Sequence, residues 1–222
     1  MGGQVHVTGN TGIDALYAAI ADLPQREVHD RATRRLLVTC HRRESWGEGI
    51  RSIASAVREL GLSGSAWVDV IVPPNSHVAG ALRELLHRCP NISLLEPCSH
   101  RELLRRMRES DLILSDSGGM QEEAPALGVP LLVLREKTER PEGVATGSMR
   151  LVGTCKETIV AETRRLLSDP AAYAAMSRPA FPYGDGRAAQ RIAAIIEEWL
   201  DGRKAVVTSA RMSPGHPARH QP

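Results

Sequence analysis

Residues 112–127 read LILSDSGGMQEEAPAL, a short apolar run followed by two glycines and a helix-forming segment. The run at residues 112–114, with its flanks to Asp116, predicts a buried strand. A helix is expected at residues 120–127, with Gly128 as its C-cap. A strand that turns through glycines directly into a helix is typical of α/β folds.

The same alternation of strand and helix patterns extends in both directions along the chain. Further strands are expected at residues 35–40, 67–72, 92–95, 130–134 and 150–152. Further helices are expected at residues 13–23, after the capping pair Asn10-Thr11, and at 50–60, 78–89, 101–109, 157–167 and 185–200. The strands are almost continuously apolar, which indicates a parallel sheet covered by helices on both faces. We therefore predict an α/β fold of the Rossmann-like class.

Composition excludes several classes of function. The chain has 222 residues and a formal net charge of +2, and only 3% of its residues are aromatic. This argues against a nucleic-acid partner, which calls for a basic excess or stacking platforms. No apolar run reaches the ~18 residues of a membrane span, and the N-terminus has no signal-peptide pattern. We therefore expect no membrane association and a cytoplasmic location.

The four cysteines are widely spaced and include no CxxC pair, so reduced thiols are expected. A zinc site at Cys40, His41, Cys98 and His100 lacks the short spacings of known zinc motifs. We expect neither a metal ion nor another cofactor.

The candidate binding residues follow from the rule that open α/β sheets bind ligands beyond the carboxyl ends of their strands. In the loop after residues 112–114, Ser117, Gly118 and Gly119 open a helix, whose N-terminus suits a phosphate or diphosphate. Glu123 lies further along that helix, where a carboxylate can bind a ribose diol. The alternative is an ordinary glycine-containing turn followed by a solvated pair of glutamates, and the pattern alone favours neither interpretation.

Two more charged loops are expected at the same edge of the sheet. His41, Arg42 and Arg43 follow the strand at residues 35–40, and the two arginines offer forked donors for phosphate. Taken alone, this loop fits a basic surface turn better. The third loop, residues 135–143, is densely charged and follows another strand. Together the three loops predict a site for an anionic, nucleotide-like ligand. The sequence GDGRAA at residues 184–189 does not follow a strand, so it is not interpreted as a dinucleotide fingerprint.

Several of these motifs, taken in order, identify a family. They are VTGNTGIDAL at residues 7–16, VTCHRRESWG at 38–47, DSGGMQEEAP at 116–125, TERPE at 138–142, VGT at 152–154 and PYGDG at 182–186. The series resembles the non-hydrolysing UDP-N-acetylglucosamine 2-epimerases of bacteria, over residues 5 to about 200. It covers only the second half of that family's two-domain fold of the glycosyltransferase-B type.

The resemblance implies that Ser117, Gly118 and Gly119 hold the diphosphate of UDP and that Glu123 holds its ribose. His41 and Arg140 would be active-site residues contacting the nucleotide or diphosphate. The implied reaction interconverts UDP-GlcNAc and UDP-ManNAc by eliminating UDP and adding it back with the opposite configuration at C2. The carboxylates for proton transfer at C2 belong to the family's first domain, which we expect to be missing, so little activity is expected from this chain alone.

The sequence departs from the family pattern at several positions. Leu103 stands about where an aromatic residue usually lies near uracil, and Cys40 stands where glycine is common. The loop PNSH at residues 74–77 replaces a pattern associated with an effector site. The alternatives to an epimerase half are a non-catalytic nucleotide-sugar-binding module and the donor-binding half of a glycosyltransferase.

The expected organisation has three parts. Residues 1–24 would form an interdomain connector with its helix, residues 25–201 the UDP-binding domain, and residues 202–222 a disordered tail. The helices at 13–23 and 185–200 are expected to show apolar faces without cover. Expected partners are UDP or UDP-GlcNAc, with either a second copy of the chain or a separately encoded N-terminal domain.

Overall fold

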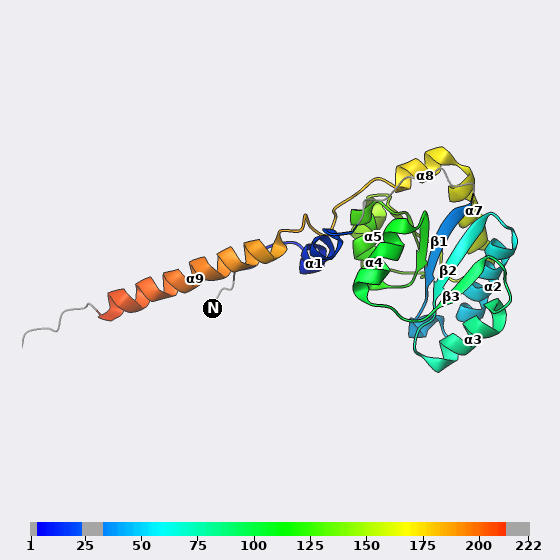
Figure 1. The fold of residues 1–222 in the computed structure, drawn as a ribbon. Helices are drawn as coiled ribbons and strands as arrows, with labels where there is room; N and C mark the ends of the chain where they lie inside the picture. The colour runs from blue at the N-terminus through cyan, green and yellow to red at the C-terminus, as the bar shows by residue number, and fades with distance from the viewer. Residues whose placement is uncertain (1–3, 24–32, 212–222) are drawn as a thin grey trace, which may run out of the picture.

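The protein is a six-stranded parallel sheet covered by helices on both faces (Figure 1). The computed structural model describes residues 4–23 and 33–211. The strands are β1 (Arg34–Thr39), β2 (Ala66–Ile71), β3 (Ile92–Leu95), β4 (Leu112–Ser115), β5 (Leu131–Val133) and β6 (Met149–Leu151). The helices are α1 (Thr11–Ile20), η1 (Arg43–Ser45), α2 (Glu48–Leu62), α3 (Ser76–Leu86), α4 (His100–Glu109), α5 (Gly118–Leu127), α6 (Pro141–Ala145), α7 (Lys156–Ser168), α8 (Pro170–Met176) and α9 (Ala188–Arg211). The predicted α/β, Rossmann-like class is confirmed.

The strand order β3-β2-β1-β4-β5-β6 creates one point where the direction of winding reverses, between β1 and β4. These two strands pair in parallel with Thr39 opposite Ser115, so they end at the same level. Loops that leave two such strands diverge to opposite faces of the sheet and open a crevice between them. The loop at His41 and the loop at Ser117 therefore begin side by side.

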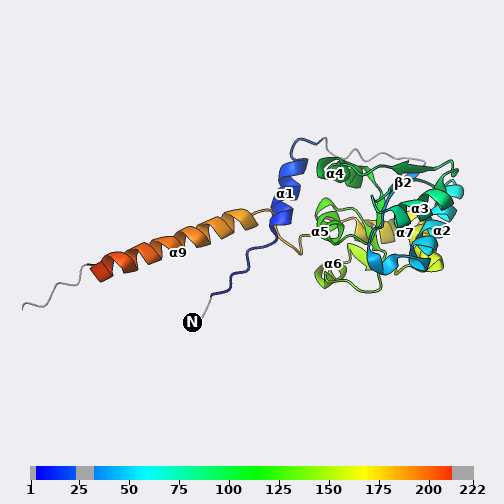
Figure 2. The ribbon, with the colours of Figure 1, turned by 90° about the horizontal axis from the view of Figure 1, so that it is seen from below.

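Alternation along the strands divides the core into two layers. Leu36 and Val38 of β1 pack with α2, α3 and α7, whereas Leu37 packs on the other face with α1, α4 and α5. Figure 2 shows these two groups of helices on opposite sides of the sheet. Because both faces are covered, β4 is buried along its whole length.

The helix boundaries follow local capping chemistry. The side chain of Asn10 accepts a hydrogen bond from the Gly12 amide and begins α1, and Asn75 and Ser99 cap α3 and α4 in the same way. Gly128 ends α5 in the left-handed conformation, with φ of 64°, which confirms its predicted role as C-cap. The sequence did not predict the short helices η1, α6 and α8.

The two terminal helices differ from expectation. In α1, Ile13 and Leu16 are 2% and 0% exposed because they pack against α4 and α5, so the predicted uncovered face of this helix was wrong. In α9, Ile196, Trp199 and Leu200 are exposed, as predicted. Figure 1 shows α9 extending away from the sheet.

The end of α9 also lies later than expected. The helix continues to Arg211, so residues 202–211 are helical and the boundary predicted at residue 202 falls inside it. The reason is local, because Arg203, Lys204 and Ala205 favour helix and no proline occurs between Ala188 and Pro214. The boundary predicted at residue 24 and the remainder of the predicted tail lie outside the described residues. Among the described helices, none is long and apolar enough to cross a membrane.

Candidate functional site

The glycine-containing N-terminus of α5 lies at the crevice between β1 and β4. Ser117 is the N-cap residue, and its side chain makes no capping hydrogen bond. Its amide donates to Ser115 Oγ at 3.0 Å, and Ser115 Oγ lies 2.6 Å from Thr39 Oγ1. These bonds fix the turn from strand to helix across the β1–β4 pair. The first amides of a helix have no acceptor within it, so this end of α5 favours an anion.

Gly118 allows Arg140 to approach the start of α5. A Cβ atom at position 118 would lie 3.2 Å from Cζ of Arg140 and 3.4 Å from each of its terminal nitrogens. At Gly119, the nearest atom to an added Cβ would be Ser117 Oγ at 4.0 Å. The guanidinium of Arg140 is therefore packed over Gly118, beside the amides that favour an anion.

Arg140 is held in place from two directions. Its Nε donates to Glu122 Oε1 at 2.6 Å, and the other carboxylate oxygen of Glu122 accepts from Asn10 Nδ2 at 2.7 Å. The hydroxyl of Tyr183 donates to the carbonyl of Arg140 at 3.1 Å and accepts from the Gly143 amide at 2.9 Å. Burial raises the pKa of Tyr183, so the phenol keeps the proton that this bond requires.

Sequence reasoning missed Glu122, Asn10 and Tyr183 as supports of Arg140. The available signal was their place in the family-like motifs at residues 7–16, 116–125 and 182–186.

His41 is positioned by Asp116, which the sequence analysis did not single out. The Asp116 carboxylate is 0% exposed and accepts hydrogen bonds from the amides of His41 and Arg42, at 2.9 and 2.8 Å to Oδ2. The imidazole Nδ1 of His41 lies 3.3 Å from Oδ1 of the same carboxylate. Asp116 directly follows β4, and its place as the first residue of the DSGG motif was the signal that could have pointed to it.

The predicted site arginines do not all converge. The Arg43 guanidinium lies 6.0 Å from the centre of the Trp46 ring, in a cation–π arrangement at the surface. Arg42 contributes its amide to Asp116, and its positive charge helps to lower the pKa of Glu139. The structure thus brings His41, Arg140 and the start of α5 together, while Arg43 faces Trp46.

A buried arginine joins the loop after β1 to the loop after β5, which are two of the three loops predicted to form the site. Arg135 is 7% exposed and donates to Glu44 at 2.6 Å and to both oxygens of Glu139 at 2.8 and 2.9 Å. The hydrogen bonds from Arg135 lower the pKa of Glu139 to about 2. Because Glu139 precedes Arg140, this network holds the loop that carries Arg140 against the loop that follows β1.

Glu123 has a partner of its own. Its Oε1 lies 2.7 Å from Nε2 of His100, the first residue of α4, and its side chain is 14% exposed. The carboxylate therefore joins α5 to the start of α4. Its predicted contact with a ribose stays a prediction.

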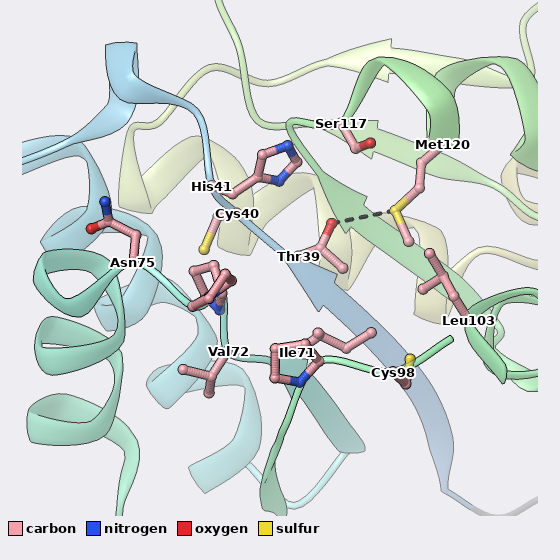
Figure 3. A pocket seen from close by; sticks show the side chains of 13 residues that line it. Thr39, Cys40, His41, Ile71, Val72, Asn75, Cys98, Leu103, Ser117 and Met120 are labelled. Carbon is pink, nitrogen blue, oxygen red and sulfur yellow. Dashed lines mark hydrogen bonds between the residues drawn. The ribbon is translucent and has the colours of Figure 1, made fainter. Parts of the chain in front are cut away.

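A cavity of about 390 Å³ opens beside this site (Figure 3). Its walls come from the ends of β1 and β2, the loop after β3 and the helices α4 and α5, and include Thr39, His41, Val72, Pro97, Leu103 and Met120. Ser117 and His41 lie at its polar side, while most of the remaining lining is apolar. Such a space suits a planar, weakly polar group next to an anion.

The cavity also contains Cys40, which is buried. Burial, together with the nearby charge of Asp116, raises the pKa of this thiol above its ordinary value, so it stays protonated and poorly nucleophilic at neutral pH. In the part of the chain that the structure describes, no group of three or more His, Cys, Asp or Glu side chains is placed to hold a metal ion.

A family model described as UDP-N-acetylglucosamine 2-epimerase matches residues 2–197. The chain belongs to the UDP-N-acetylglucosamine 2-epimerase family. This confirms the family resemblance that the motifs carried.

Individual family members agree with this assignment. The UDP-N-acetylglucosamine 2-epimerase of Salmonella typhimurium is 40% identical over 209 residues, which cover 88% of this chain and 55% of the relative. The crystal structure of UDP-GlcNAc 2-epimerase from Neisseria meningitidis bound to UDP-GlcNAc superposes with a TM-score of 0.81 at 36% identity, covering 86% of this chain and 55% of that one. The co-structure of S. aureus MnaA with UDP has the same TM-score and identity, with coverages of 88% and 54%.

The chain therefore spans about half the length of the curated relatives that it matches. Its single sheet is one Rossmann-like unit, as expected for half of a glycosyltransferase-B-type fold.

Proposed function

We propose that this chain is the UDP-binding half of a non-hydrolysing UDP-GlcNAc 2-epimerase. The proposal rests on three features that meet at the β1–β4 crevice. They are the start of α5, the Arg140 guanidinium over Gly118, and the His41 imidazole beside Asp116. All three favour an anion, and a largely apolar cavity lies beside them. A diphosphate joined to a pyrimidine nucleoside has this combination of chemistry.

In this proposal, each group has a distinct task. The α5 amides and the Ser117 hydroxyl bind the diphosphate, and Arg140 balances its charge. His41 contacts the diphosphate from the end of β1, and Glu123 binds the ribose, sharing its carboxylate with His100. The uracil ring lies in the cavity, where Leu103 supplies an aliphatic wall.

The chemistry proposed for the full enzyme is elimination followed by re-addition. The C1–O bond to UDP breaks as the proton at C2 is removed, which gives an enclosed 2-acetamidoglucal. UDP then adds back with the opposite configuration at C2. This half of the enzyme stabilises the negative charge that develops on UDP as it leaves, which is an electrostatic task.

Proton transfer at C2 is assigned to the other half of the enzyme. Three carboxylates of the α5 segment each face a partner: Asp116 faces backbone amides, Glu122 faces Arg140 and Glu123 faces His100. We therefore propose that the chain alone turns over little substrate, because general acid and base groups worth about 10²–10⁴-fold each are supplied elsewhere.

The proposed partner in the cell is an N-terminal domain, joined or separately encoded, that supplies the general acid and base groups. The proposal also allows a dimer with a second copy of the chain. The exposed apolar residues of α9 are a natural surface for the other domain. The proposal also includes a cytoplasmic location and a product used in cell-envelope polysaccharide synthesis.

Calorimetry with UDP tests the proposal. The full chain should bind UDP and should bind uridine more weakly, since uridine has no diphosphate. Arg140→Ala should weaken UDP binding by about tenfold or more, as expected for loss of a charged hydrogen-bonding group. Arg150→Ala is the matched control, because Arg150 pairs with Glu162 at the surface away from the crevice. Equal affinity for UDP and uridine, or an unchanged Arg140→Ala variant, would contradict the assigned site.

An epimerisation assay on the same preparation tests the second part of the proposal. Little UDP-ManNAc should form from UDP-GlcNAc with this chain alone. Robust turnover would show that the proton-transfer groups lie within the chain.

A further inference from the structure

Asp116 occupies an unusual position for a carboxylate. It is 0% exposed, yet it lies at the end of β4, directly behind the loop that carries His41. Burial of a charge is unfavourable unless hydrogen bonds compensate for it. The compensation is visible here, since the carboxylate accepts from two successive backbone amides and has an imidazole nitrogen at 3.3 Å.

The two oxygens of Asp116 have different tasks. Oδ2 is the closer acceptor for both amides, at 2.9 Å from His41 N and 2.8 Å from Arg42 N. Oδ1 lies 3.2 Å from His41 N and 3.3 Å from Nδ1 of the His41 ring. One oxygen therefore fixes the backbone of the loop, and the other faces the ring.

An acceptor facing Nδ1 has a consequence for the histidine. A neutral imidazole carries its proton on one ring nitrogen, and a hydrogen-bond partner selects which one. A carboxylate can only accept, so the negative charge of Asp116 at 3.3 Å favours the proton on Nδ1. Nε2, on the far side of the ring, is then the nitrogen left for a ligand at the cavity that His41 lines.

We infer that Asp116 is a positioning residue that sets the tautomer and orientation of His41 at the proposed site for a nucleoside diphosphate. The identity of the ligand in this inference rests on the proposed function, whereas the tautomer of His41 in the free protein does not depend on it. In the neutral ring Nε2 is an acceptor, so only the ring protonated on both nitrogens donates from Nε2 to a diphosphate oxygen, with Nδ1–H facing Asp116 on the other side.

The substitution Asp116→Asn separates this role from a purely structural one. The asparagine oxygen can replace Oδ2 and still accept from both amides, which keeps the loop closed. Its NH₂ group then replaces Oδ1 and faces Nδ1. Because an amide NH₂ donates, Nδ1 must accept, and the proton of the neutral ring moves to Nε2.

Nitrogen-15 NMR of the histidine rings in the full chain measures the tautomer directly, without any ligand. The chain has eight histidines, and His41→Gln identifies the signals of His41. We expect the proton on Nδ1 in the natural chain and on Nε2 in Asp116→Asn. We also expect UDP to bind Asp116→Asn about tenfold more weakly, which corresponds to loss of a charge-assisted hydrogen bond.

Asp111→Asn is the matched control. Asp111 is also a buried aspartate that accepts a backbone amide of β1, from Arg35 at 2.8 Å, but it lies at the opposite end of β1 and β4. This variant should leave the tautomer of His41 and the affinity for UDP unchanged.

The inference is overturned if the natural chain carries the proton on Nε2, or if Asp116→Asn keeps it on Nδ1. Should Asp116→Asn fail to fold, the spectrum of the natural chain still tests the inference, since a proton on Nδ1 supports it and a proton on Nε2 overturns it. Absence of UDP binding by the natural chain would instead contradict the proposed function, and the tautomer of the free protein would still be readable.

Discussion

At the residue scale, Gly118 and Gly119 look alike in the sequence but differ in their surroundings. An added Cβ at position 118 meets the Arg140 guanidinium at 3.2–3.4 Å, whereas one at position 119 has 4.0 Å to its nearest neighbour. Both residues lie in the first turn of α5, where alanine favours helix over glycine by about 0.5–1 kcal/mol.

We therefore predict different effects of two similar substitutions on the stability of the free protein. Gly119→Ala should raise the free energy of unfolding by up to about 1 kcal/mol. Gly118→Ala should gain less or lose stability, since it displaces Arg140 from Glu122. Urea denaturation of both variants measures this difference. Equal stabilisation by both would show that Arg140 does not pack over Gly118.

Only some of the site residues could be identified from the sequence. Ser117, Gly118 and Gly119 were identified because a strand–glycine–helix pattern is local, and the helix end follows from it. Asp116 and Glu122 were missed because their tasks depend on His41 and Arg140, which lie 75 and 18 residues away. Nothing local distinguishes Glu122 from Glu123, although their side chains reach Arg140 and His100 respectively.

At the element scale, the loops after β1 and β5 depend on Arg135. Its bonds to Glu44 and Glu139 join two segments 91 residues apart. The hydrogen bonds from Arg135 lower the pKa of Glu139 from 4.5 to about 2.

This shift predicts a direction for stability against pH. A carboxyl group with a lowered pKa in the folded state stabilises the fold above pH 4.5, and this contribution is lost as the pH falls toward 2. Glu139→Gln should therefore remove part of the decrease in unfolding free energy across that interval. Denaturation at several pH values measures it, with Glu84→Gln as a control at an exposed surface pair. The same pH slope in Glu139→Gln and the natural chain would contradict the role of Arg135.

Most elements were predictable because their patterns are local. The strands of the sheet were expected within a residue or two of their observed bounds, since continuous apolar runs and prolines delimit them. The helices η1, α6 and α8 are three to seven residues long, too short to show a periodic pattern. The burial of α1 could not be predicted, because it depends on how that helix packs against α4 and α5.

At the scale of the whole molecule, α1 and α9 have opposite environments. Leu16 of α1 is 0% exposed, whereas Ile196 and Leu200 of α9 are 50% and 44% exposed. Of these three side chains, only Leu16 belongs to the hydrophobic core.

Truncating these side chains should therefore have very different effects. Leu16→Ala should lower the free energy of unfolding by about 2–5 kcal/mol, as for other buried leucines. Ile196→Ser with Leu200→Ser should change it by no more than about 0.5 kcal/mol per site, as for surface positions. Chemical denaturation compares the two. A large loss from the α9 variant would show that this face already packs within the chain.

The central claim is that UDP binds at the β1–β4 crevice, and mapping UDP binding onto the backbone amides by NMR tests it most directly. We predict that titration with UDP shifts the amide signals of Gly118 and Gly119 and those of His41 and Arg140, while amides at the opposite end of the sheet, such as Arg35, stay unchanged. Shifts that spare the start of α5, or no shifts at millimolar UDP, would contradict the claim.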